Sequence, residues 1–447
     1  MAEEVAVVGL GRFGGGRGLV RELLAQGFCV RLFDREPREN LAEALKAFEG
    51  VGPERLKVIC GAHRLEDFRG LRLCYLNPAV PWEGELAKGL RTMGIRLSSD
   101  LELFMDSWKG NAIGITGTNG KSTLWEILHR LLPDWAAGGN RGVSVFEMDR
   151  KGKPGAILEL SSFQLERIGS RFPIAAVTVF TQDHLDHHGG MEGYRRAKQR
   201  LLDFQTPSDF AVFGRELGDW SAKGRRLDLG VTLQFEGETL RFPDGLGLDV
   251  SRFPLKGPHN KDLLALALAC AREALKDDAL LAHRLREIGE KGMAPLPYRQ
   301  NVLSETPYLV VDDSKSTTPE STLCALEAFG GATAGMHLIA GGEEKKLDIT
   351  PMMEVLKGSK ARVYVIGRQT PRWESHPLSR QVPWESCGDL ESAVKRIAQV
   401  IKPGEKLLLS PGTSSHDQFK DYRERGKRFR ECVAKHLQLS VAAAAAD

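Results

Sequence analysis

Residues 112–128, AIGITGTNGKSTLWEIL, place a glycine-rich turn between an apolar strand pattern and a helical pattern. A strict Walker A motif would need glycine where this chain has Ile115. The physical features of a phosphate-binding loop are present all the same, because a glycine-permitted turn directs its N–H groups inward at the positive end of the following helix. Lys121 can place its ammonium on the β- and γ-phosphates, and Ser122 or Thr123 can hold Mg²⁺. We interpret this stretch as a nucleotide-binding loop, with a chance glycine-rich turn as the weaker alternative.

The composition bounds the class of protein. The chain has 447 residues, of which 42% are apolar and 27% charged, with a net charge of +3. These values are typical of a soluble protein with two to four domains. No half of the chain is strongly basic, whereas proteins that bind nucleic-acid backbones concentrate Lys and Arg on one face. We therefore expect small-molecule substrates and no nucleic-acid partner.

The cysteines and the N-terminus indicate a location. The seven cysteines are scattered, with no C-x-x-C pair and no metal-ligand spacing, which is typical of reduced thiols in the cytoplasm. The start of the chain, MAEEVAVVGLG, is acidic and continues directly into a strand pattern, so we expect no signal peptide. The longest apolar run, residues 263–271, is far shorter than a membrane span. We expect a cytoplasmic monomer with no membrane partner.

The strand and helix patterns divide the chain into three α/β domains, which we expect at residues 1–97, 98–297 and 298–447. The first opens with a strand–helix–strand pattern and carries a G-x-G-x-x-G motif at Gly9, Gly11 and Gly14, with Asp34 at the end of the second strand. That context favours a Rossmann-like domain. The middle domain combines a mostly parallel sheet around the nucleotide-binding loop with short alternating segments at 231–245, which suggest a small antiparallel sheet. The third domain alternates strands and helices again and is predicted to be Rossmann-like.

Two polar residues lie at the ends of strand patterns in the middle domain. Glu159 and His184 each follow an apolar strand, where open α/β sheets place their sites. A carboxylate and an imidazole beside a triphosphate can form a second cation site. Residues 183–188, DHLDHH, look like a zinc motif by themselves, but oxygen-rich phosphate sites prefer Mg²⁺. We expect His187 and His188 to lie in an exposed turn.

Lys198 lies among other basic residues in the helical segment YRRAKQR at 194–200. From this segment alone, a solvated basic face is the favoured interpretation. The alternative is chemical, because an ammonium among cations has a lowered pKa, and a neutral amine can react with carbon dioxide to give a carbamate. A carbamate would make the lysine an oxygen ligand for a metal.

Three polar loops follow strand patterns in the third domain, at residues 312–321, 341–348 and 410–419. They supply Lys315, Thr317, Ser415 and either Lys345 or Lys346. Lysines and hydroxyls at strand ends suit a small anionic substrate, and ordinary polar loops are an equal alternative.

Together these residues resemble the Mur ligase family over nearly the whole chain, and most closely its D-glutamate-adding branch. The matching segments are TGTNGKST, LELSSFQLE, TQDHLDHH, YRRAKQR, DDSKSTT and SPGTSSHDQFKDYRERG, at residues 116–123, 158–166, 181–188, 194–200, 312–318 and 410–426. The resemblance raises the carbamate interpretation of Lys198 above the solvated-face interpretation.

The resemblance implies an ATP-dependent ligase of peptidoglycan precursor synthesis with three domains. ATP would convert the carboxylate of UDP-N-acetylmuramoyl-L-alanine into an acyl phosphate, which the amine of D-glutamate attacks. The implied catalytic residues are Lys121, Lys198 and His184. Two Mg²⁺ ions would be held by Ser122 and by Glu159, His184 and carbamylated Lys198.

The resemblance also implies the substrate contacts. The ATP-binding residues are Gly117, Thr118, Asn119, Gly120, Lys121, Ser122, Thr123, Asn260, Arg299 and Asp313. D-Glutamate would contact Lys315, Thr317, Lys345, Ser415 and Tyr422. The UDP-sugar would contact Gly11, Arg12, Phe13, Asp34, Arg35 and Asn140.

Four departures from the family pattern lie at its substrate edges. Arg141 follows Asn140 in GNRG, where the family has G-N-I-G, and the loop NPAVP at Asn77 replaces the usual S-P-G-type turn. Tyr298 stands where a histidine often precedes the arginine, and Thr318 stands where asparagine is common. The competing functions are a Mur-type ligase for another amino acid such as L-glutamate, a nicotinamide-dependent dehydrogenase built on the first domain, and a non-catalytic nucleotide-binding module.

Overall fold

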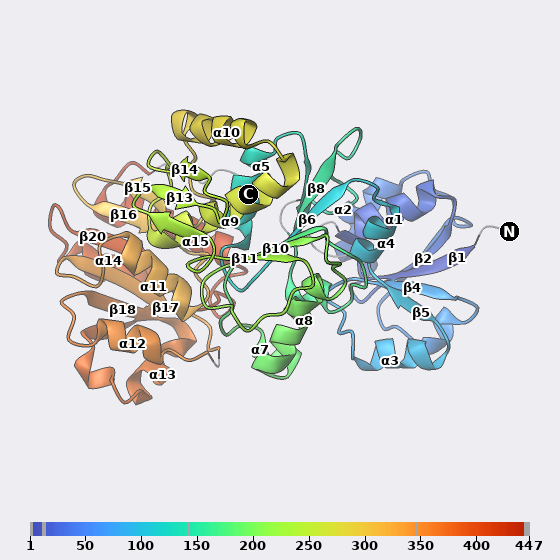
Figure 1. Cartoon of the computed structure of the whole chain (residues 1–447). Helices are drawn as coiled ribbons and strands as arrows, with labels where there is room; N and C mark the ends of the chain where they lie inside the picture. The colour runs from blue at the N-terminus through green and yellow to red at the C-terminus, as the bar shows by residue number, and fades with distance from the viewer. Residues whose placement is uncertain (1–2, 11–14, 141–142, 346, 442–447) are drawn as a thin grey trace. The chain divides into compact units, whose positions relative to one another are not determined.

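The computed structural model describes residues 3–10, 15–140, 143–345 and 347–441. The chain forms three mainly parallel sheets, one small antiparallel sheet and the helices that cover them, which confirms the predicted α/β class (Figure 1). It divides into two compact units. The first consists of Met1–Phe180, His184–Ser251 and Leu263–Arg286, and the second of Thr181–Asp183, Arg252–Asp262 and Glu287–Asp447. The expected boundaries at residues 97 and 297 stay a prediction.

The first sheet has five parallel strands in the order β3-β2-β1-β4-β5. Its strands are β1 (Glu4–Val8), β2 (Cys29–Asp34), β3 (Leu56–Cys60), β4 (Leu73–Leu76) and β5 (Arg96–Ser98). The helices of this segment are α1 (Gly15–Ala25), α2 (Arg38–Leu45), α3 (Glu85–Thr92) and α4 (Asp100–Ser107). The predicted strand–helix–strand opening is confirmed by β1, α1 and β2.

The second sheet has six parallel strands in the order β11-β10-β9-β6-β8-β7. Its strands are β6 (Asn111–Thr116), β7 (Ala136–Gly139), β8 (Gly155–Glu159), β9 (Ile174–Val177), β10 (Phe210–Phe213) and β11 (Arg225–Asp228). The helices are α5 (Lys121–Leu131), α6 (Ser162–Leu165), α7 (Leu185–His188) and α8 (Met191–Asp203). Both β6 and β8 are almost wholly buried, as expected for central parallel strands.

The predicted antiparallel sheet is confirmed. It contains β12 (Gln234–Glu236), β13 (Thr239–Arg241) and β14 (Gly247–Asp249). Two helices follow, α9 (Pro258–Leu275) and α10 (Asp278–Lys291).

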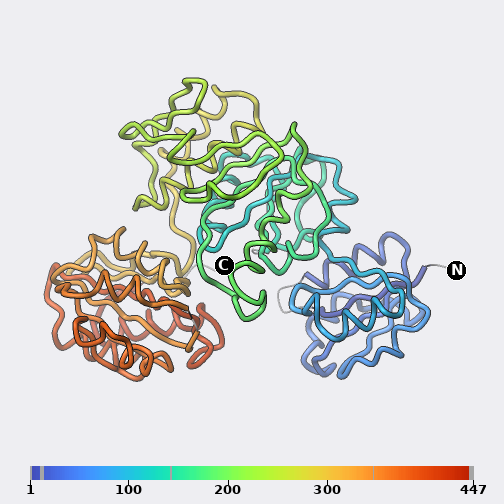
Figure 2. The backbone as a smooth tube through the Cα atoms, turned by 60° about the horizontal axis from the view of Figure 1, so that its bottom comes forward, coloured from blue at the N-terminus to red at the C-terminus, as the bar shows by residue number. Residues whose placement is uncertain are grey.

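The last sheet has the order β15-β16-β20-β17-β18-β19, with β15 antiparallel and the remaining pairs parallel. Its strands are β15 (Asn301–Ser304), β16 (Leu309–Asp312), β17 (Met336–Gly341), β18 (Arg362–Ile366), β19 (Trp384–Gly388) and β20 (Lys406–Leu409). The helices are α11 (Pro319–Ala328), α12 (Thr350–Leu356), α13 (Thr370–Ser375), α14 (Leu390–Ala398) and α15 (Tyr422–Leu437). Figure 2 follows these strands and helices along the backbone from yellow to red.

Thr318 has a local structural role. Its side chain accepts a hydrogen bond from the N–H of Ser321 and caps α11, with Pro319 in the first turn. Thr318, which replaces the asparagine common in the family, therefore serves as the N-cap of α11.

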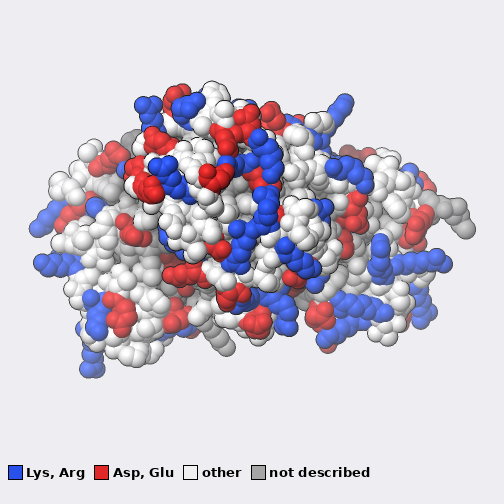
Figure 3. Space-filling view, viewed as in Figure 1, with Lys and Arg blue, Asp and Glu red and all other residues white. Residues whose placement is uncertain are grey.

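Charges of both signs are interspersed on the face that Figure 3 shows. Among the described residues, no helix is long and apolar enough to cross a membrane.

Candidate nucleotide and metal site

The nucleotide-binding loop has the geometry that its glycines require. Gly117 has a φ of +138°, and a Cβ there would lie 1.9 Å from Thr178 Oγ1. Gly120 is left-handed with a φ of +83° and caps α5, which begins at Lys121. Ser122 is buried in the first turn of that helix. The loop therefore presents backbone N–H groups at a helix N-terminus, as a phosphate site needs.

Lys121 and Lys198 share a hydrogen-bond acceptor. Lys121 Nζ donates to the carbonyl oxygens of Gly117 (2.8 Å) and Thr118 (2.7 Å). Lys198 Nζ donates to the same Gly117 oxygen (2.7 Å), although the two lysines lie on different helices. The fold thus brings two of the three predicted catalytic residues to one point of the loop.

The solvated-face interpretation of Lys198 is wrong. Lys198 is 1% exposed, and the buried residues of α8 follow a helical period through Tyr194, Ala197, Lys198, Leu201 and Leu202. Its ammonium lies 4.6 Å from the centre of the Tyr194 ring. The neighbouring arginines are directed elsewhere, since Arg195 pairs with Asp219 and Arg200 donates to the Ile168 carbonyl.

Glu159 ends β8 and is 3% exposed. Asn140 donates to Glu159 Oε1 from its side chain (3.0 Å) and to the Glu159 carbonyl from its backbone (2.7 Å). Glu159 Oε2 is buried and has no hydrogen-bond partner among the described residues. A buried carboxylate oxygen without a partner is costly, and a hard cation such as Mg²⁺ would satisfy it. The residues present therefore fit a metal at this position.

His184 is exposed. It has a left-handed backbone (φ +50°) and precedes α7. Its ring lies 4.9 Å from that of Phe163, the second residue of α6.

The expectation of an exposed turn at His187 and His188 is wrong for His188, whereas His187 stays partly exposed. The two residues end α7, and the His188 side chain is only 3% exposed. His188 Nε2 lies 2.9 Å from Ser162 Oγ, and His187 Nε2 lies 3.2 Å from Glu166 Oε2. Burial and then the neighbouring His187, His184 and Lys198 lower the pKa of His188 to about 4. The sequence could not show this burial, because the partners come from the segment after β8.

The described residues of the predicted UDP-sugar site lie at the end of β2 and beside Glu159. Asp34 ends β2, is buried, and accepts hydrogen bonds from the N–H groups of Leu10 (2.7 Å) and Glu36 (3.0 Å). It therefore stabilises the turn after β1, with the exposed Arg35 beside it. Asn140 lies against Glu159, as described above. Gly11, Arg12 and Phe13, together with Gly14 and Arg141, lie outside the described residues.

Arg167 is a buried residue that the sequence did not single out. Its side chain is 0% exposed and donates to the carbonyls of Leu76 (3.0 Å), Asn77 (2.8 Å), Pro78 (3.1 Å) and Val80. Burial lowers the pKa of its guanidinium to about 10. Arg167 thereby fixes the loop NPAVP, which departs from the family pattern, against the segment that carries Glu159.

Three of the predicted ATP-binding residues belong to the second unit. Asn260 donates to the Lys256 carbonyl (2.6 Å). Arg299 lies between Tyr298 and Gln300, which both have positive φ angles (+61° and +50°). Asp313 is buried and accepts from Ser316 Oγ (2.5 Å), Ser410 Oγ (2.9 Å) and the Gln300 N–H (3.1 Å). Burial raises the pKa of Asp313 to about 7 despite these hydrogen bonds.

The predicted amino-acid residues lie on loops after β16, β17 and β20. Lys315 Nζ lies 3.7 Å from the centre of the Tyr422 ring, at the start of α15. Thr317 is half-buried and Ser415 is 2% exposed. Lys345 follows β17, and its carbonyl accepts from Arg372 (2.8 Å). Lys346 lies outside the described residues.

Arg425 joins two of these loops. This fully buried residue donates to Ser314 Oγ (3.1 Å) and to the carbonyls of Ser314 (2.8 Å), Thr413 (3.1 Å) and Ser414 (3.3 Å). The acceptors immediately precede Lys315 and Ser415. This role could not be predicted from the sequence, because surface arginines are common on such basic helices.

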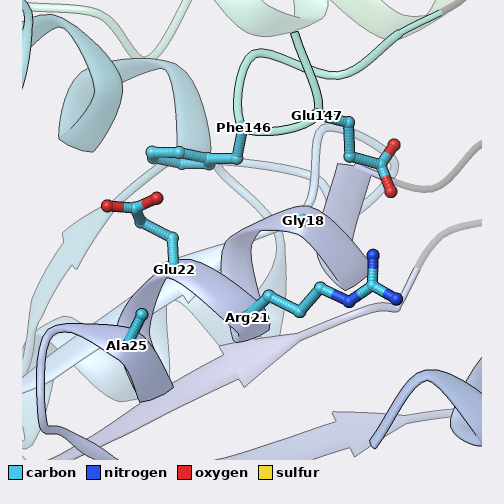
Figure 4. Close-up of a pocket in the computed structure, with 6 residues that line it drawn as sticks. All are labelled: Gly18, Arg21, Glu22, Ala25, Phe146 and Glu147. Atoms are coloured by element: carbon cyan, nitrogen blue, oxygen red, sulfur yellow. The ribbon is translucent and has the colours of Figure 1, made fainter. Parts of the chain in front are cut away.

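A hollow of about 420 Å³ lies away from all of these residues. It is lined by Gly18, Arg21, Glu22, Ala25, Phe146 and Glu147 (Figure 4). Figure 4 shows Glu22 below the Phe146 ring, with Arg21 and Glu147 farther to the right. Within the described part of the chain, none of the predicted site residues lines it, so its volume alone assigns it no chemistry.

Known proteins resemble this chain over nearly its full length. Residues 115–223 match the Mur ligase middle domain. A UDP-N-acetylmuramoylalanine–D-glutamate ligase of Anaeromyxobacter dehalogenans is 33% identical over 465 residues, covering 97% of this chain and 98% of that protein. The ligase of the same name from Acidobacterium capsulatum is 30% identical over 468 residues, covering 97% and 96%.

Solved structures resemble it in fold. The MurF ligase of Thermotoga maritima in complex with ADP aligns with a TM-score of 0.57 at 17% identity, covering 98% of this chain and 95% of that one. A pseudomurein peptide ligase type C of Methanothermus fervidus gives 0.58 at 14% identity, covering 97% and 99%. With relatives at 30% and 33% identity along nearly its whole length, this chain belongs to the Mur ligase family, in the branch of the UDP-N-acetylmuramoylalanine–D-glutamate ligases.

Proposed function

We propose that this protein is an ATP-dependent ligase that joins D-glutamate to UDP-N-acetylmuramoyl-L-alanine in peptidoglycan precursor synthesis. The main structural support for this reaction is that Lys121 and Lys198 both donate to the Gly117 carbonyl. Gly117 follows β6, and the buried Glu159 ends the neighbouring strand β8. The choice of substrates is supported by the names of the full-length relatives.

The reaction has two steps. The carboxylate of UDP-N-acetylmuramoyl-L-alanine attacks the γ-phosphorus of ATP, which gives an acyl phosphate and ADP. The amine of D-glutamate then attacks the acyl carbon, and the tetrahedral intermediate loses phosphate to leave the amide. The loop N–H groups and Lys121 offset the negative charge that spreads over the transferring phosphoryl group.

Two Mg²⁺ ions would be held by oxygen and nitrogen ligands of the middle segment. Ser122 would hold the first ion, and Glu159, His184 and carbamylated Lys198 the second. The ions would supply neutralising charge next to the phosphates and the substrate carboxylate. Glu159 Oε2 supports this assignment, since it is buried without a hydrogen-bond partner among the residues described.

Carbamylation of Lys198 is chemically reasonable at this position. The neutral amine attacks carbon dioxide, an N–C bond forms, and one proton leaves to give a carbamate with one negative charge. Lys198 is 1% exposed, and its Nζ lies 2.7 Å from the Gly117 carbonyl oxygen of the nucleotide-binding loop. The product would add an oxygen ligand beside the Gly117 carbonyl.

We infer three functional domains at residues 1–97, 98–297 and 298–447. The first would bind the uridine diphosphate end of the substrate, the second ATP, and the third the amino acid through Lys315, Thr317, Lys345, Ser415 and Tyr422. Arg299, Asn260 and Asp313 would contact the nucleotide of ATP. We also infer a monomer that works in the cytoplasm.

The test is a panel of amino acids assayed for ATP-dependent phosphate release with UDP-N-acetylmuramoyl-L-alanine. We expect release with D-glutamate, and a product whose mass is the sum of both substrates less one water. Release with L-glutamate or another amino acid alone would assign the enzyme to a different Mur reaction. A dehydrogenase is not favoured, and calorimetry with NAD and UDP tests it directly, since NAD should give no heat of binding.

A further inference from the structure

Glu166, His187 and His188 form a cluster of potential metal ligands beside the proposed magnesium site. Their ligand atoms all lie within 4.8 Å of one another. His187 Nε2 is 3.2 Å and His188 Nδ1 is 3.7 Å from Glu166 Oε2. Bonds of about 2.0–2.2 Å at tetrahedral angles place ligand atoms roughly 3.3–3.6 Å apart. Small side-chain movements would therefore bring all three onto one ion.

Ser162 orients one of the imidazoles. Its Oγ lies 2.9 Å from His188 Nε2, so the imidazole can donate from Nε2 and keep the Nδ1 lone pair, which faces Glu166. Metal-bound histidines usually hold their second ring nitrogen by such a hydrogen bond. Ser162 thus supplies this second hydrogen bond for His188, the least exposed of the three potential ligands.

The donor set selects the type of ion. Two imidazole nitrogens and one carboxylate suit Zn²⁺ and similar borderline transition metals, whereas Mg²⁺ prefers oxygen ligands. Three protein ligands leave one position for water. Arg167 Nη2, 3.6 Å from Glu166 Oε1, opposes a cation here. That guanidinium is, however, also held by the carbonyls of Leu76, Asn77, Pro78 and Val80. Glu166 Oε2 faces both imidazoles.

We propose that Glu166, His187 and His188 bind one Zn²⁺ or a similar divalent transition-metal ion that links the end of α6 to α7. The link would join the segment that follows Glu159 to the short helix that follows His184. An ion that binds only the folded arrangement stabilises it by mass action. The proposal does not rest on the ligase activity, because its readouts are metal binding and thermal unfolding.

The experiment uses the full-length protein without a histidine tag, stripped with a chelator and kept in excess Mg²⁺. Zn²⁺ binding is measured by calorimetry, and Co²⁺ is added separately to report nitrogen ligands through its visible absorption. We expect one equivalent of Zn²⁺, a rise in unfolding temperature, and a four-coordinate Co²⁺ spectrum. Glu166→Gln and His187→Ala should each weaken Zn²⁺ binding by at least about tenfold, and Ser162→Ala by about tenfold.

Two matched variants separate this site from its surroundings. Glu159→Gln removes the carboxylate of the proposed magnesium site, and His283→Ala removes an exposed histidine on α10. Both should keep full Zn²⁺ affinity. His187 has a 23% exposed side chain, so His187→Ala should fold even where a substitution at the buried His188 does not. The proposal is overturned if wild type shows no stoichiometric Zn²⁺ binding, or if Glu159→Gln abolishes binding while Glu166→Gln retains it.

Discussion

Asn140 Nδ2 donates a 3.0 Å hydrogen bond to Glu159 Oε1, while the other carboxylate oxygen of Glu159 is buried without a described partner. The amide thus orients the carboxylate and leaves one oxygen for a cation. In this arrangement Asn140 orients a potential metal ligand, whereas the family resemblance implies that it contacts the sugar nucleotide. The first role predicts a changed Mg²⁺ requirement in an Asn140 variant, and the second predicts a changed KM for the UDP-sugar.

Asn140→Ala should raise the free Mg²⁺ concentration needed for half-maximal activity by about 10- to 100-fold, as losses of hydrogen bonds to metal ligands do. The measurement is phosphate release against free Mg²⁺ at fixed Mg-ATP. The matched control is Asn40→Ala, which removes a surface bond from Asn40 Nδ2 to Glu36 Oε2 (2.8 Å). An unchanged Mg²⁺ requirement with a raised KM for the UDP-sugar would instead assign Asn140 to the sugar nucleotide.

Lys198→Ala should be nearly inactive and regain part of its activity with acetate, which can occupy the space of the carbamate oxygens. The physical reason is that the variant loses the proposed oxygen ligand but keeps Glu159 and His184. Arg196→Ala, an exposed change on the same helix, should stay active and gain nothing from acetate. Full activity of Lys198→Ala in buffer depleted of carbon dioxide would contradict the carbamate.

The sequence predicted what depends on local patterns. Strand β6, the glycine turn and α5 are contiguous, so apolar periodicity and glycine positions were sufficient to place Lys121 and Ser122. Glu159 was predicted in the same way, because it ends a buried strand. The antiparallel sheet followed from short alternating segments.

The contacts that the sequence did not reveal join distant segments. Arg167 meets a loop about ninety residues earlier, and Arg425 meets Ser314 over a separation of 111 residues. Whether an arginine is solvated or buried against carbonyls depends on which segment the fold places over it. The same holds for Lys198 and His188, whose neighbours in sequence are polar but whose side chains are buried.

The raised pKa of Asp313 predicts a pH-dependent stability. Burial raises this pKa from 3.8 in the unfolded chain to about 7 in the folded protein. The folded protein therefore holds a proton that the unfolded chain releases, and this group's contribution to stability falls as pH rises from about 4 to about 7. The upper limit of the effect is roughly 4 kcal/mol, at about 1.4 kcal/mol per pKa unit.

Asp313→Asn should remove this dependence. The difference in unfolding temperature, variant minus wild type, should increase between pH 4 and pH 7. Above pH 7 this difference should stay constant. Asp203→Asn, at an exposed position, controls for the loss of a carboxylate. A parallel pH profile for wild type and Asp313→Asn would show that Asp313 is ionised throughout this range.

Lys315 should determine the affinity for the amino acid. Its ammonium rests 3.7 Å from the Tyr422 ring centre, and Arg425 fixes the adjoining Ser314, so the cation is held in place before substrate binds. A charge-assisted contact to a substrate carboxylate contributes about 1.5–3 kcal/mol. Lys315→Ala should therefore raise the KM for D-glutamate about tenfold or more and change the KM for ATP little.

The matched control for this change is Lys360→Ala, an exposed lysine of the same unit, which should leave both KM values unchanged. Stereochemistry gives a second measurement. When both carboxylates are clamped, inversion at the α-carbon turns the amine away from the acyl phosphate, so wild type should use D-glutamate far better than L-glutamate. Because the clamp enforces this choice, Lys315→Ala should also narrow the ratio of kcat/KM between the two enantiomers. Two results would contradict this site for the amino acid. One is equal use of D- and L-glutamate by wild type, and the other is a raised KM for ATP with an unchanged KM for D-glutamate in Lys315→Ala.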